Sequence, residues 1–231
     1  MNGSGVTSQP IFYLFIAFSI LLSLGYSWGS RRNKKILNGA MDALADIFKP
    51  KDQQFTNIGG LSGYHANFIP HRNRYIRRVD ATVTLLPRQS WLYLPFSKLI
   101  RRFDRLYIVL YLAPEVMGTL SEGHIIEKGY STFHGAKIEN ESRLSKETIT
   151  WGGKTFFLYF EGPEVKAALE KCMKMVGEPG PLRHVALVPE QDRMFLFMIP
   201  RPGKVKEIVS PVHQWFIQLL GSRRSAEAPA E

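Results

Sequence analysis

Arginine and lysine side chains gather in one third of the chain. Their types and spacing could bind an anionic group. A guanidinium group binds phosphate through a planar fork of N–H donors, so clustered arginines favour an anionic partner such as RNA or a lipid headgroup. The alternative is a solvated basic face without a partner. We predict an RNA- or phosphate-binding surface formed by Arg72, Arg74, Arg77, Arg78, Lys98, Arg101, Arg102 and Arg105.

The whole net charge of +10 belongs to this third of the chain. Residues 1–30 carry no charged side chain, residues 31–105 hold fifteen Lys and Arg against five acids, and residues 106–231 hold fifteen of each. Such an imbalance bears on partners rather than on fold. Because no RNA-recognition, KH or helix-turn-helix signature accompanies it, we do not expect sequence-specific recognition of a nucleic acid.

Catalytic and metal-binding patterns are not found in the sequence. The six histidines form no H-E-x-x-H pair and have no cysteine partner at zinc spacing. The single cysteine, Cys172, lies on the apolar face of a predicted helix, where a packed thiol is expected. We therefore expect no catalytic residue, cofactor, metal or small-molecule substrate, and interpret the protein as not an enzyme. An anchored enzyme with an unrecognised site is the alternative.

The stretch Ile11–Trp28 is apolar and long enough to cross a membrane. A helix of this length measures about 27 Å, close to the ~30 Å thickness of the hydrocarbon core. A cleaved signal peptide is the alternative, but no basic residue precedes the run and no clear small-x-small cleavage site follows it. The membrane flank is basic on one side only, at Arg31, Arg32, Lys34 and Lys35. The positive-inside rule then predicts an outside N-terminus and a cytoplasmic remainder.

The elements that carry the basic residues follow from periodicity. Apolar residues recur at helical spacing from Ile36 to Phe48, so we expect the membrane helix to continue to about Phe48, bent near Gly29. A separate amphipathic helix on the membrane surface is the alternative. The stretch 55–73 is rich in turn residues and is expected to be a loop. Its glycines could suggest a phosphate cradle, but no Gly-Lys-Ser/Thr follows them, so a plain turn is expected.

The rest of the pattern predicts an α+β fold. Alternation over 78–85 indicates a half-buried strand, and the continuous apolar run 106–112 indicates an inner strand. A short helix between them aligns four cations opposite its apolar side chains: Lys98, Arg101, Arg102 and Arg105.

Further along the chain, residues 148–160 form a predicted hairpin around Gly152-Gly153, followed by a helix that stops at Gly177. Two strands around a turn at 189–192 come next. Ser210-Pro211 is expected to cap a last helix. The predicted organisation is a short extracytoplasmic N-terminus (1–10), a transmembrane helix (11–30), a basic linker helix (31–50), a cytosolic α+β domain (51–220) and a flexible tail (221–231).

The order of these features resembles the calumin family, the endoplasmic-reticulum coiled-coil-domain proteins of the PAT chaperone and multipass translocon. The likeness covers most of residues 20–205 by pattern. It rests on GSRRNKKILNGAMDALADIF, FTNIGG, RYIRRVDATVTLLPRQSWLYLPFSKLIRRFDRLYIVLYL and LRHVALVPEQDRMFLFMIPRPG.

The resemblance implies a factor that assists insertion and folding of multispanning membrane proteins. It implies as partners the ribosome, through ribosomal RNA, the Sec translocon and other insertion subunits. The implied location is the endoplasmic reticulum membrane, or the plasma membrane in a prokaryote. The chain departs from the family because only ten residues precede the span, in place of a long acidic lumenal region, and no extended basic C-terminal coiled coil follows. Calcium binding and contacts toward the exit tunnel are therefore in doubt. A membrane-anchored scaffold or lipid-binding module, with its basic face on anionic lipid, is the alternative.

Overall fold

A single helix, α1, runs without interruption from Pro10 to Phe48. The predicted continuation of the apolar helix to Phe48 is therefore confirmed, and the alternative of a separate second helix is wrong. Its last turns, from Ile36 to Phe48, carry buried residues that belong to the protein core. Residues 31–48 are thus a packed part of the folded domain rather than a linker leading to it.

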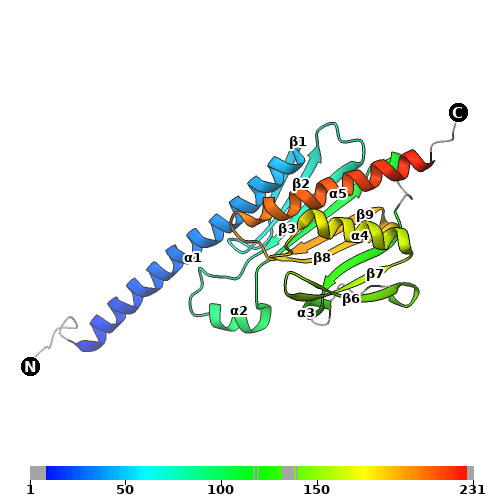
Figure 1. Ribbon diagram of the computed structural model, residues 1–231. Coiled ribbons are helices and arrows are strands. Elements are labelled where there is room, and N and C mark those ends of the chain that lie inside the picture. Colours follow the sequence, from blue (N-terminus) through cyan, green and yellow to red (C-terminus); the bar gives the residue numbers. More distant parts are fainter. Residues whose placement is uncertain (1–8, 117, 119, 132–137, 139, 228–231) are drawn as a thin grey trace, which may run out of the picture.

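The computed structural model describes residues 9–116, 118, 120–131, 138 and 140–227. These residues form one antiparallel sheet with the strand order β1-β2-β3-β4-β9-β8-β5-β7-β6 (Figure 1). The strands are β1 Pro50–Asn57, β2 Gly63–Pro70, β3 Ile76–Thr84, β4 Arg105–Leu112, β5 Gly123–Glu127, β6 Ser145–Trp151, β7 Lys154–Phe160, β8 Leu182–Val188 and β9 Arg193–Met198. The fold is α+β, as the sequence predicts.

Three longer helices, α1, α4 and α5, pack together on one face of this sheet (Figure 1). Two short helices, α2 and α3, lie outside this layer. The bounds of the remaining helices are α2 Leu94–Arg101, α3 Lys128–Ser131, α4 Pro163–Val176 and α5 Lys204–Glu227.

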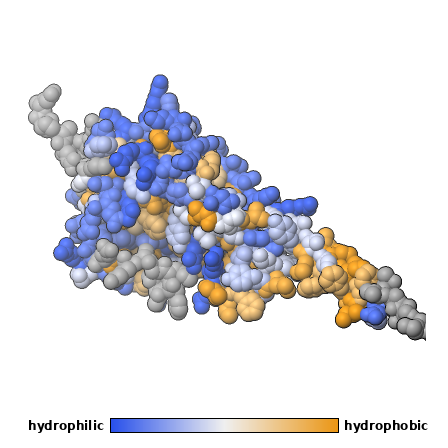
Figure 2. Space-filling view, turned by 180° about the vertical axis from the view of Figure 1, so that it is seen from behind, coloured by the Kyte–Doolittle hydropathy of each residue, from blue (hydrophilic) through white to orange (hydrophobic). Residues whose placement is uncertain are grey.

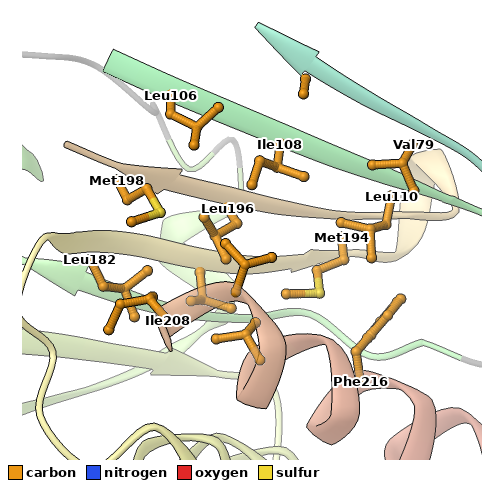
Figure 3. Close-up of a cluster of buried hydrophobic side chains, with 14 of the residues drawn as sticks. Val79, Leu106, Ile108, Leu110, Leu182, Met194, Leu196, Met198, Ile208 and Phe216 are labelled. Carbon is orange, nitrogen blue, oxygen red and sulfur yellow. The ribbon is translucent and has the colours of Figure 1, made fainter. Parts of the chain in front are cut away.

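The main core lies between the three long helices and the sheet. Strand register places Val79 opposite Leu110 and Leu110 opposite Met194, so alternate side chains of three neighbouring strands share one face. Figure 3 shows these side chains directed toward α5, where Ile208 and Phe216 meet them. The predicted alternation in the strand before α2 is confirmed, because Val79, Ala81, Val83 and Leu85 are all buried.

Two segments differ from the sequence predictions. The stretch 55–73 is not a loop, because it contains the end of β1 and all of β2, paired from Pro50↔Pro70 to Asn57↔Tyr64. β1 is an exposed edge strand held by backbone hydrogen bonds, so its sequence shows no hydrophobic alternation. The last helix begins at Lys204 rather than at Ser210, and Pro211 lies inside it.

The predicted terminal segments are only partly described. The backbone of α5 stays helical to Glu227, so most of the expected flexible tail, 221–231, is helix. Residues 1–8 of the expected extracytoplasmic N-terminus and residues 228–231 of the tail lie outside the described residues.

Candidate functional site

The outer half of α1 carries a long, exposed apolar surface. Large side chains such as Leu14, Phe15 and Leu24 are each about two-thirds exposed. Of the helices described, α1 alone has the length and hydropathy that crossing a membrane requires. Figure 2 shows this hydrophobic surface extending away from the polar body of the protein. Its exposure and composition are consistent with a helix half that crosses a membrane.

A second apolar surface, on α2 and the segment before it, lies at the same end of the molecule (Figures 1 and 2). Leu99 is 79% exposed and Ile100 is 70% exposed. We call this surface the α2 patch; it consists of Trp91, Leu92, Tyr93, Phe96, Leu99 and Ile100. The amphipathic pattern predicts the helix but does not show that its apolar side is left uncovered, and this is the feature that sequence reasoning missed.

Two glycines of α1 allow the α2 segment to pack closely against it. A Cβ atom at Gly25 would lie 2.9 Å from the ring of Trp91, and one at Gly29 would overlap the backbone carbonyl of Arg88. Any larger residue would push the two segments apart. The glycines therefore place the start of the α2 patch directly on α1, at the end of its apolar half.

A buried polar network holds the same junction in place. The Asn33 side-chain amide donates to the Leu86 carbonyl at 2.9 Å, and its oxygen accepts from Arg88 Nη1 at 2.9 Å. The Arg88 guanidinium also forms two hydrogen bonds with the Asp104 carboxylate, at 2.9 and 2.7 Å. Because Asp104 accepts the Leu86 N–H as well, the network joins both ends of the α2 segment to α1. Such a bidentate, largely buried pair fixes geometry strongly.

The predicted helical row of four cations is broken in the structure. Lys98 and Arg101 are exposed on α2, but the helix ends at Arg101. Arg102 has a positive φ of 61° at the C-cap, and Arg105 is half-buried as the first residue of β4. The four residues therefore do not share a helix face. Lys98 and Arg101 remain next to the α2 patch, with neither in an ion pair among the described residues.

The predicted membrane flank is exposed and follows the apolar surface of α1 directly. Arg31, Arg32, Lys34 and Lys35 all face solvent, while Asn33 between them is buried. The guanidinium carbon of Arg32 lies 5.4 Å from the centre of the Trp28 ring. The cationic residues thus begin where the apolar residues of α1 stop.

The second predicted arginine cluster lies at the other end of the sheet. Arg72 and Arg74 are in the turn between β2 and β3, and Arg77 is at the start of β3, all exposed. We call these three the distal arginines; in the described part of the chain none of them forms a salt bridge. Arg78 differs, because it pairs with Asp80 at 3.1 Å and lies 4.2 Å from the Tyr111 ring centre.

The length of α1 separates the two basic regions. The His71 N–H donates to the carbonyl of Lys49 at 3.1 Å, which places the β2–β3 turn at the C-terminal end of α1. From Gly25, where Trp91 packs, to Lys49 the helix rises about 36 Å at 1.5 Å per residue. Figure 1 shows α2 and the β2–β3 turn at opposite ends of the molecule. The eight predicted phosphate-binding residues therefore do not form one surface.

A cavity of about 500 Å³ opens on the sheet face opposite the long helices. Tyr107, Phe195 and Phe197 line it, together with a histidine pair that has no motif in the sequence. His124 Nδ1 lies 3.3 Å from His184 Nε2, and His124 Nε2 lies 3.1 Å from Glu122. These strand positions become neighbours only through sheet pairing, so no spacing along the chain could have revealed them.

Burial lowers the pKa of both histidines of this pair. Desolvation lowers the pKa of His184 to about 3, with a smaller contribution from neighbouring His124. Desolvation also lowers the pKa of His124, although the Glu122 carboxylate opposes the shift. Among the described residues, no group of three or more His, Cys, Asp or Glu is arranged to hold a metal ion.

Cys172 is buried in α4, and burial raises the pKa of its thiol far above the ordinary range.

In comparisons with known proteins, no protein-family model matches the chain and no curated protein matches it significantly. The candidate sites are therefore defined by the geometry of this structure: an apolar end with cations around it, and a distal basic end.

Proposed function

We propose that the protein is a single-pass membrane protein whose cytosolic domain assists the insertion and folding of multispanning membrane proteins. In this proposal it works beside the Sec translocon and other insertion subunits, without catalysing a reaction. The resemblance to the calumin family motivates the function, and the endoplasmic reticulum membrane, or a prokaryotic plasma membrane, is the location that it favours.

The observation that carries this proposal is the continuity of α1. One helix joins the exposed apolar segment to the core, with no linker between them. If the apolar half spans a bilayer, the distal arginines are held on the far side of the domain, away from the lipid. An exposed arginine cluster in that position suits ribosomal RNA, because phosphate contacts need no base recognition.

Ribosome binding by the full chain in a mild detergent free of anionic lipid tests this proposal. Reversing the distal arginines with Arg72→Glu, Arg74→Glu and Arg77→Glu should greatly reduce the fraction that pellets with ribosomes at low salt. A matched control with the same change in charge reverses three exposed cations of the other half of the chain: Lys171, Lys174 and Arg201. The control should pellet like the unaltered protein.

Failure of the unaltered protein to pellet with ribosomes would contradict the ribosome contact. Equal pelleting of the distal triple variant would contradict the role of these arginines. Co-purification in mild detergent tests the translocon assignment separately, since recovery of Sec subunits is expected and their absence argues against it.

A membrane-anchored lipid-binding module is a second candidate, and the position of Lys98 and Arg101 favours it. Both side chains lie beside the α2 patch, at the end of the molecule where α1 is apolar. Cations in such a position attract anionic headgroups by roughly 1 kcal/mol each. Retention of phosphatidylserine over phosphatidylcholine by the purified full chain, lost in Lys98→Glu with Arg101→Glu, would support this candidate.

A further inference from the structure

The α2 patch exposes more large apolar side chains than a water-facing helix of eight residues needs. Phe96, Leu99 and Ile100 are each at least 66% exposed, although the same helix has a buried residue, Ser97. The helix therefore turns its polar Ser97 toward the protein and its apolar side chains outward. This arrangement is the reverse of a helix that covers a core, and it indicates an apolar environment outside the protein.

The position of the patch identifies that environment. Trp91 packs on Gly25, which lies within the apolar run of α1, about 4.5 Å along the axis before Trp28. Anything that surrounds α1 at the level of Gly25 therefore also meets the first residues of the patch. The two apolar surfaces are neighbours at one end of the protein (Figure 2).

Charge around the patch fits the surface of a bilayer. Arg31 and Arg32 follow the apolar run of α1, and Lys98 and Arg101 are the exposed cations of α2. Helices that lie in the membrane interface have this arrangement. Their apolar side chains are at the level of the acyl chains, and their cations lie above them among the headgroups. Trp91 and Tyr93 belong to the residue types that favour this interface.

We propose that the segment 91–101, which holds the α2 patch, is embedded in the interface of the same bilayer that α1 crosses. The exposed side chains of the α2 patch lie among the acyl chains, and Lys98 and Arg101 lie among anionic headgroups. The inference rests on the membrane anchor of the proposed function. It adds a second attachment point, which restrains the rotation and tilt of the cytosolic domain relative to the bilayer.

The rigid junction with α1 makes this second attachment effective. The Asn33–Arg88–Asp104 network holds the segment against α1, so the patch cannot swing away from the membrane independently. Two contacts on one rigid body set an orientation that a single helix leaves free. The distal arginines are then presented in a constant direction.

Single-cysteine labelling of the full chain in vesicles of phosphatidylcholine and phosphatidylserine tests the proposal. Buried Cys172 has a raised pKa and is not expected to react, so the natural sequence is a suitable background. An environment-sensitive fluorophore is placed on Leu99→Cys, in the patch. Lipid-attached nitroxide should quench it several-fold more than it quenches the same label on Arg72→Cys, and aqueous iodide should show the opposite order.

A label on Phe18→Cys, in the apolar half of α1, separates failure of this inference from failure of the anchor. Quenching by lipid at position 18 but by iodide at position 99 would overturn the embedded α2 segment and leave the anchor intact. Iodide quenching at both positions would overturn the anchor itself. Protection of position 99 from both quenchers would mean that protein, not lipid, covers the patch, and it would also overturn the inference.

Discussion

The two ends of the molecule carry the same kind of charge in different surroundings. At the α2 end, Lys98 and Arg101 stand beside six exposed large apolar residues of the α2 patch. At the distal end, the region 71–78 has three exposed arginines and, among its described residues, no exposed large apolar side chain. In the proposed function both ends bind phosphate, and in the further inference only the α2 end also contacts acyl chains. Surroundings, rather than net charge, separate a lipid partner from an RNA partner.

A rigid domain holds the two ends apart, and removing Asp104 should disturb this domain most. Asp104→Ala leaves the largely buried Arg88 without its carboxylate partner, so we expect a loss of about 3–5 kcal/mol in the free energy of unfolding. Asp46→Ala removes a carboxylate from the exposed pair with Lys206 and should cost less than about 1 kcal/mol. Denaturant unfolding in detergent measures both. Equal losses would show that the junction network adds no special rigidity.

A pair of glycines in α1 tests whether the α2 segment is held on that helix. Gly29→Ala would overlap the Arg88 carbonyl and should destabilise the protein by about 1–3 kcal/mol. Gly39→Ala meets no atom within 4 Å and should stabilise the helix by about 0.5–1 kcal/mol. Opposite signs in thermal unfolding confirm the close approach, and a gain in both would refute it.

Low pH should unfold the folded domain that carries both basic ends. The pKa of His184 is about 3 in the folded protein, against an ordinary value near 6.5 that applies to the unfolded chain. The unfolded chain therefore binds the proton more readily. The contribution of His184 to the free energy of unfolding is fully present above pH 6.5 and is lost as the pH drops toward 3. Each pH unit in that window should cost about 1.4 kcal/mol for this group.

Substitution identifies the groups responsible for this acid dependence. His184→Gln should flatten the fall in unfolding free energy between pH 6.5 and pH 5, whereas His71→Gln, in an exposed turn, should leave it unchanged. Ribosome binding should be lost as the domain unfolds, because the folded domain holds the distal arginines in place. A flattening by the exposed variant instead would argue against the buried pair.

The smallest expected effect is a difference between two adjacent arginines at the distal end, measured as the salt dependence of ribosome affinity. Arg77→Gln removes an exposed cation and should flatten the dependence of log ribosome affinity on log salt by roughly 0.7–0.9. Arg78→Gln removes a cation that already pairs with Asp80, so a smaller change is expected. The salt series is run on the full chain in detergent. A larger change for Arg78 would contradict the choice of the distal arginines as the contact.

Elements with a clear burial pattern could be predicted from the sequence. Val79, Ala81 and Val83 alternate with polar residues because one face of β3 is buried, and Gly152-Gly153 has the positive φ angles that a tight turn demands. β1 was missed because an exposed edge strand needs only backbone pairing. The start of α5 was misplaced because a favourable Ser-Pro cap pattern lies inside a helix held by the core.

The candidate site was only partly predictable for a different reason. Clustering of arginines along the sequence is visible, but which clusters meet depends on the sheet and on the length of α1. Asn33 lies 53 residues from Leu86 in the chain and donates to its carbonyl, which no local pattern encodes. Amphipathic spacing in α2 likewise identifies an apolar side without showing what covers it.

The central claim is that the two basic ends face different surroundings. The most direct test measures the height of each end above a bilayer. A donor fluorophore is attached at Lys98→Cys or at Arg72→Cys in the full chain, inserted into nanodiscs with acceptor-labelled headgroups. Energy transfer should be strong from position 98 and much weaker from position 72, because about 36 Å of α1 lies between Gly25, where the α2 segment packs, and Lys49, beside the β2–β3 turn. Equal transfer from both positions would contradict the claim.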